Sequence, residues 1–207
     1  MKQLAKFMSR DKLRYFASGI FYSKLSYCLP VFGNVFGLER FKEESSRYTS
    51  YTKNDNNSLQ VLKNKLNRLL LNARYDTPTS QLLEETDSLS VQQMIAYQTA
   101  VMAYKVLTSK KPEYLADKLK ILNVGGSLRK KTGSISLPRY SLSISREGFL
   151  YRASTILNLM EEDWSCDPNS EKFKIHAKDW VKANIAIKPF KDSRSMSFSS
   201  RKIQNQH

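Results

Sequence analysis

The sequence predicts a mainly α-helical protein with short β-strands confined to one basic segment. Apolar residues recur at spacings of three and four over several long stretches, which is the period of an amphipathic helix. Hydroxyl and proline residues stand where several of these stretches begin, as helix starts require. A period of two, typical of strands, occurs only between residues 125 and 152. The hydrophobic content of 41% is sufficient for a packed core.

Residues 1–40 are predicted to form a first helical segment. Ser9 is placed to cap a helix that begins at Arg10, and apolar side chains then recur at helical spacing as far as Cys28. Pro30 and Gly33 end the pattern. Residues 41–58 lack apolar periodicity and are rich in turn formers, so we expect a polar linker there.

Residues 59–187 are predicted to form a helical C-terminal region, and the cleanest helix in it runs from Leu59 to Ala73. Its leucines form one stripe, and Ser58 is placed to cap it. Lys63, Lys65 and Arg68 occupy much of the remaining surface. We therefore expect a buried leucine face and an exposed basic face.

Three further helices are expected before the basic segment. The first is short and follows Thr77 and Pro78. The second opens at Ser90, which with Gln93 matches a capping box, and continues to about Thr108 as a broad apolar helix in the centre of the protein. The third is short and begins at Pro112.

The basic segment, residues 125–152, combines cations, small hydroxyls and aromatic rings. Ile135 and Leu137 alternate with serines, and residues 140–144 repeat that alternation, so we expect short strands interrupted at Pro138. Glu147 is its single acidic residue. Its cations are Arg129, Lys130, Lys131, Arg139, Arg146 and Arg152.

Two helices and a tail complete the predicted order. Residues 149–160 return to helical periodicity. Ser170 is placed to cap a last helix, whose inward side chains are predicted to be Phe173, Ala177, Trp180 and Val181. Residues 188–207 are rich in serine, lysine and arginine, and this composition predicts a disordered basic tail.

The charge balance indicates a polyanionic partner. Thirty-four basic residues face nineteen acidic ones, and the formal net charge is +15. Nucleic acid is the usual partner for such a chain, and an anionic membrane surface is the alternative. The most apolar region, residues 25–38, is too short to span a bilayer. Two distant cysteines and no secretory signal favour an intracellular protein, nuclear or cytoplasmic.

The sequence contains no pattern for catalysis, for a cofactor or for a metal. Cys28, Cys166, His176 and His207 show none of the spacings that ligate zinc. Two histidines make a serine–histidine–aspartate site improbable, and no phosphate-binding loop is present. Adjacent aspartates, which two-metal phosphoryl transfer uses, do not occur. We therefore expect a binding protein that has no catalytic residues and is not an enzyme.

Six strings in order resemble the region downstream of the catalytic palm in jockey-like non-LTR retrotransposon reverse transcriptases. Phe32 stands where that family usually has Trp, and Ile156-Leu157-Asn158 stands where it usually has Leu-Trp-Asn. The resemblance covers roughly residues 4–181. The strings are Tyr22–Gly33 (thumb helix and turn), Leu59–Ala73, Tyr75–Leu83, Leu89–Leu107, Leu137–Ala153 and Phe173–Trp180.

The resemblance implies a transposable-element fragment, with a thumb-like segment and a helical C-terminal region, that lacks the palm and its Asp-Asp motif. In the parent polymerase this piece would bind template RNA or an RNA–DNA duplex while the palm polymerises. Lysines and arginines supply charge for phosphates, and tyrosines supply faces for stacking. The candidate nucleic-acid contacts are Lys63, Lys65, Arg68, Arg129, Lys130, Lys131, Arg139, Tyr140, Arg146, Tyr151 and Arg152.

Two alternatives stay open at this point. In the first, the chain is a small helical interaction module whose cations serve an acidic protein partner. In the second, a basic amphipathic helix attaches it to a membrane surface.

Overall fold

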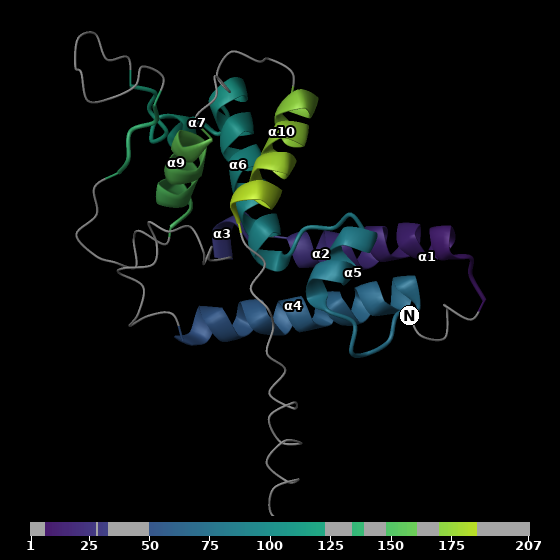
Figure 1. Ribbon diagram of the computed structural model, residues 1–207. Coiled ribbons are helices and arrows are strands. Elements are labelled where there is room, and N and C mark those ends of the chain that lie inside the picture. The colour runs from purple at the N-terminus through teal and green to yellow at the C-terminus, as the bar shows by residue number, and fades with distance from the viewer. Residues whose placement is uncertain are drawn as a thin grey trace, which may run out of the picture.

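The computed structural model describes residues 7–27, 29–32, 50–122, 134–138, 148–160 and 170–185, and these form a mainly helical protein. Figure 1 shows α4 lying alongside the N-terminal helices, while α6, α9 and α10 stand together above them. The helices are α1 (Arg10–Phe16), η2 (Ala17–Tyr22), α2 (Ser23–Ser26), α3 (Leu29–Phe32), α4 (Ser50–Leu71), α5 (Thr79–Glu85), α6 (Val91–Ser109), α7 (Glu113–Ala116), α9 (Phe149–Leu159) and α10 (Ser170–Asn184).

Helix α6 is the centre of the main core, as the sequence predicts. The capping box is present: the Ser90 hydroxyl accepts from the Gln93 amide at 3.2 Å, and the Gln93 side chain accepts from the Ser90 amide at 2.9 Å. Ala96, Ala100 and Ala103 are fully buried, and such small side chains allow neighbouring helices to approach closely. Helices α3, α9 and α10 all pack against α6.

Helix α10 is attached to α6 by ring stacking and a buried hydrogen bond. The rings of Phe173 and Tyr104 are stacked with centroids 4.1 Å apart. The Gln93 side-chain amide donates to the Ile185 carbonyl at 2.9 Å. The predicted inward residues Phe173, Ala177 and Val181 are buried, and Trp180 is half-buried.

The N-terminal helices pack directly onto the C-terminal region. Leu13 and Ala17 form a second, smaller apolar cluster with Leu66 and Leu70 of α4. Residues from the predicted segments 1–40 and 59–187 therefore share one buried cluster.

Helix α4 begins at Ser50, inside the stretch predicted as a polar linker, so Ser58 is a helical residue and does not cap the helix. Residues 50–58 contain neither Pro nor Gly, and extending an existing helix costs far less than starting one. Residues 41–49 lie outside the described residues.

The predicted strands reduce to one antiparallel bridge, between Ile121 and Ile135, within the described part of the chain. The Asn158 side chain of α9 binds both backbone groups of Ile135, accepting from its amide at 2.7 Å and donating to its carbonyl at 2.9 Å. An asparagine side chain thus replaces a neighbouring strand for Ile135. Residues 140–144, the second predicted strand, lie outside the described residues.

Candidate functional site

The predicted nucleic-acid contacts fall into three groups in the structure. Lys65 is exposed, and Arg68 and Tyr151 are half-buried. Lys63 and Arg152 are both only 1% exposed. The remaining candidates, Arg129, Lys130, Lys131, Arg139, Tyr140 and Arg146, lie outside the described residues.

Arg152 holds two distant parts of the chain together and does not present its charge to solvent. Its Nη2 atom donates to the carbonyl of Pro30 at 2.6 Å and to that of Val31 at 3.3 Å. Carbonyls at the end of a short helix have no partner within that helix, so a guanidinium satisfies them well. Arg152 is therefore placed as a tie between α9 and α3, which corrects its assignment as an accessible phosphate contact.

Lys63 is also buried, on a side of α4 that the sequence predicts to be exposed. Its ammonium donates to the Leu89 carbonyl and lies 5.4 Å from the centroid of the Tyr22 ring. No carboxylate of the described residues forms an ion pair with it. Burial lowers the pKa of Lys63 to about 8, because the charged form loses hydration.

The buried side of α4 is polar because α5 and the loop that follows it supply hydrogen-bond partners. The Asn67 side chain accepts from the Tyr22 hydroxyl at 2.8 Å and donates to the Ser88 hydroxyl at 3.2 Å. The Asn64 side chain donates to the Thr79 hydroxyl at 2.9 Å. Leu62, by contrast, is 48% exposed, so the predicted buried leucine stripe is only partly covered.

A cavity of about 350 Å³ opens beside Lys63, between α4 and α6. Arg14 and Lys63 contribute cations to its wall, and none of the described carboxylates lines it. The side-chain oxygen of Gln98, another lining residue, is buried and has no hydrogen-bond partner among the described residues.

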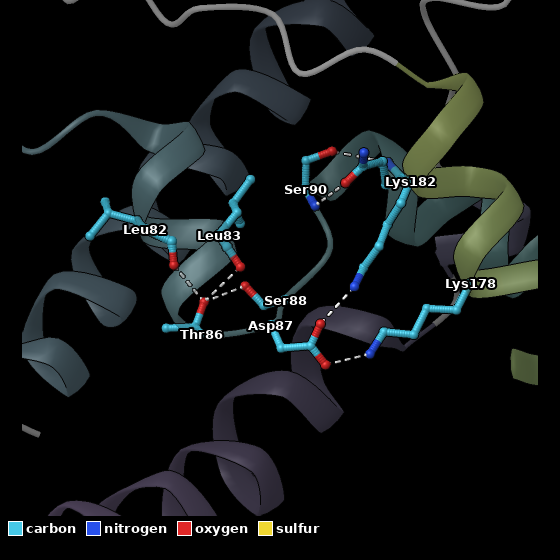
Figure 2. Close-up of polar contacts among 9 residues, drawn as sticks. Leu82, Leu83, Thr86, Asp87, Ser88, Ser90, Lys178 and Lys182 are labelled. Atoms are coloured by element: carbon cyan, nitrogen blue, oxygen red, sulfur yellow. Dashed lines mark hydrogen bonds and ion pairs between the residues drawn. The ribbon is translucent and has the colours of Figure 1, made fainter.

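Asp87 binds two lysines of α10, as Figure 2 shows. Its carboxylate oxygens lie 2.7 Å from the Lys178 ammonium and 2.6 Å from the Lys182 ammonium. Hydrogen bonds from Lys178 and Lys182 lower the pKa of Asp87 to about 2. The single carboxylate offsets one of the two positive charges, so Asp87, Lys178 and Lys182 together keep a net charge of +1.

Five exposed lysines, absent from the predicted contacts, lie between residues 105 and 120 at the end of α6 and around α7, and Glu113 and Asp117 are exposed in the same stretch. None of these lysines forms an ion pair with a carboxylate in the described ranges. Tyr114 lies among them and is 67% exposed. The Lys110-Lys111 pair at the predicted helix end was the available sequence signal. We call these residues the α6–α7 lysine surface: Lys105, Lys110, Lys111, Lys118 and Lys120.

Metal sites and membrane spans are both missing from the part of the chain that the structure describes. No group of three or more histidine, cysteine, aspartate or glutamate side chains is placed to hold a metal ion there. None of the helices described combines the length and the apolar character needed to cross a bilayer.

No protein-family model, no curated protein and no solved structure matches the chain.

Proposed function

We propose that this protein binds nucleic acid through the α6–α7 lysine surface and the basic segment 125–152 that follows it in the chain. The observation that carries the proposal is a run of exposed lysines without carboxylate partners in the described residues. Lysines at such positions release counterions when they meet phosphates, which is the main source of sequence-independent affinity.

The local arrangement suits a phosphate backbone. Lys110 and Lys111 follow the C-terminus of α6, where the helix dipole stabilises cations. Lys118 and Lys120 lie beyond α7, near the bridge that leads toward the basic segment. Tyr114 adds an exposed ring on which a base can stack. The surface therefore offers charge along the backbone and one stacking face.

The resemblance to retrotransposon reverse transcriptases favours RNA or an RNA–DNA duplex as the ligand, with polymerisation left to a palm domain. An acidic protein is the alternative partner, and an anionic membrane surface is the third candidate. Only a nucleic-acid ligand requires affinity that follows the number of phosphates contacted.

The test combines charge reversal with a salt series. The triple variant Lys110→Glu, Lys111→Glu and Lys118→Glu is compared with the intact protein by fluorescence anisotropy on a single-stranded RNA and an RNA–DNA duplex. We expect at least tenfold weaker binding and a shallower dependence of log K on log salt, by about 0.7 to 0.9 for each phosphate that the variant no longer neutralises.

A matched control changes the same amount of charge elsewhere. Lys12, Lys24 and Lys172 are exposed on α1, α2 and α10, and their reversal to Glu should weaken binding much less. Equal losses of affinity in both triple variants would point to unspecific attraction and against this surface. An RNA affinity that stays flat between low and high salt would overturn the proposal, because it would show that these lysines do not neutralise phosphates.

A further inference from the structure

The environment of Lys63 is electrostatically incomplete. Fully buried lysines are rare, and those that occur are normally paired with an anion, because an ammonium out of water loses its hydration. An ammonium has three protons to donate, and the hydrogen bond to the Leu89 carbonyl uses one. The Tyr22 ring face offers further attraction but no negative charge.

The wall of the adjacent cavity carries a second incomplete group. The Gln98 side-chain oxygen is buried without a hydrogen-bond partner among the described residues, although such atoms nearly always have one. Lys63 and Gln98 come from different helices, α4 and α6, and both line this cavity. Lys63 lacks an anionic partner and the Gln98 oxygen lacks a donor, and both residues line the same cavity. This combination points to a ligand.

The remaining lining residues define the chemistry of that ligand. The apolar side chains of Leu70, Leu89 and Met94 and the rings of Tyr22 and Tyr97 favour a flat apolar body, and Thr86 and Ser88 add two hydroxyls to the wall. Arg14, exposed on α1, adds a second cation to the wall. The volume of about 350 Å³ falls within the range of about 300 to 1,000 Å³ for small-molecule sites.

We propose that this cavity binds a small aromatic anion whose charged group lies against Lys63 and whose ring lies among the apolar side chains. The proposal does not rest on nucleic-acid binding, since it uses none of the residues of the α6–α7 lysine surface. A charged ligand supplies the missing counter-ion, while a donor on its ring satisfies the Gln98 oxygen.

The experiment asks whether the cavity prefers a negative charge. 4-Hydroxybenzoate, 6-hydroxy-2-naphthoate and 4′-hydroxybiphenyl-4-carboxylate, whose ring hydroxyls can donate to the Gln98 oxygen, are each titrated calorimetrically at pH 7 against the full chain. Each is compared with the neutral compound in which CH2OH replaces the carboxylate. We expect at least one acid to bind tenfold or more tightly than its alcohol. Lys63→Met, which keeps the length of the side chain, should remove this preference and leave weak binding of the ring.

Control variants distinguish the loss of the binding site from the loss of the folded structure. Lys65→Met removes an exposed lysine two residues away in the same helix and should leave the preference intact. Lys63→Gln retains a donor for the Leu89 carbonyl without the charge, and serves if the methionine variant does not fold. Circular dichroism verifies each variant.

Three results would overturn the proposal. The first is equal binding of acid and alcohol by the intact protein, and the second is that no acid of the panel binds. The third is that Lys65→Met reduces the preference for the acid as much as Lys63→Met does. Binding of the acids by the triple glutamate variant of the α6–α7 lysine surface should equal that of the intact chain. The experiments can therefore contradict one proposal while the other still holds.

Discussion

The ammonium of Lys63 loses its hydration on burial and gains two contacts in return. These are a hydrogen bond to one carbonyl and the face of one aromatic ring. Replacing an incompletely paired buried charge by an apolar side chain of similar volume is often neutral or stabilising. We therefore attribute to Lys63 a cost in stability.

The pH dependence of stability checks this cost. The pKa of Lys63 is about 8 in the folded protein against 10.5 for the free side chain, so the unfolded chain binds more protons between these values and stability rises with pH. Between pH 7 and 9.5 the free energy of unfolding should rise by about 2 kcal/mol relative to that of Lys63→Met, measured by urea denaturation.

The upper limit of pH 9.5 keeps most of a second titration out of the measurement. Burial raises the pKa of Tyr22, whose ring faces Lys63, whereas in the unfolded chain its phenol has the ordinary pKa of 10.0 and is still mostly protonated at this limit. A difference between the two proteins that does not change with pH would show that the Lys63 ammonium is not charged and buried as described.

At the scale of elements, α10 is attached to α6 by apolar packing and to the loop before α6 by Asp87. Asp87 has a positive φ of 46°, a conformation that aspartate and asparagine tolerate better than most residues. The two lysines that bind it are one helical turn apart, so both ammoniums reach one carboxylate.

Asp87→Asn is expected to loosen α10 without disturbing the loop. Because the carboxylate is 70% exposed, solvent screens both ion pairs, and we expect a loss of about 1 kcal/mol at low ionic strength. The loss should vanish in about 1 M NaCl, where screening is nearly complete. Urea denaturation at both salt concentrations measures it.

The contribution of Asp87 rises with pH, as that of Lys63 does, because folding lowers both pKa values, but it changes in the acid range. The folded pKa of Asp87 is about 2 against 3.8 in the free side chain, so its contribution is present above pH 3.8 and disappears as pH falls through 2. Asp179→Asn, on the exposed side of α10, is the control and should change little. Equal effects of the two substitutions would show that the Asp87 pairs add nothing.

At the scale of the whole molecule, the N-terminal helices are not a separate segment, because buried contacts join them to the later helices. Tyr22 donates to Asn67, Leu13 packs with Leu66 and Leu70, and Arg152 binds the end of α3. Each contact links residues far apart in sequence, so the described residues share buried groups across the predicted boundary.

A chain that begins at Ser50 should lose most of its stability. It exposes Leu66 and Leu70, each worth about 2 kcal/mol, and leaves the buried Arg152 without its carbonyl partners, at a cost of about 1 to 3 kcal/mol. These losses approach the stability of a typical domain, about 5 to 15 kcal/mol. We expect a broad, non-cooperative urea transition by circular dichroism.

Removal of residues 188–207 is the matched deletion, and it should leave the transition unchanged because their composition predicts disorder. An unchanged midpoint in the chain from Ser50 would show that the N-terminal helices fold separately.

Apolar periodicity determined where most helices lie, whereas Ser90 is the predicted cap whose side-chain hydrogen bond is present and Ser9 makes none. The capping box of Ser90 and Gln93, the inward face of α10 and the central place of α6 all follow from local sequence and are confirmed. These features depend on neighbours within one or two helical turns, so sequence alone contains the information.

Tertiary structure alone decided which side of α4 is buried and which cations remain in solvent. Lys63, Lys65 and Arg68 look alike in sequence, yet of these three only Lys65 is exposed. Burial depends on the hydrogen-bond partners that α5, η2 and the Asp87 loop bring to α4 from distant positions in the chain. A periodic pattern reports which residues share a helix face, but the packing of other helices decides which face is covered.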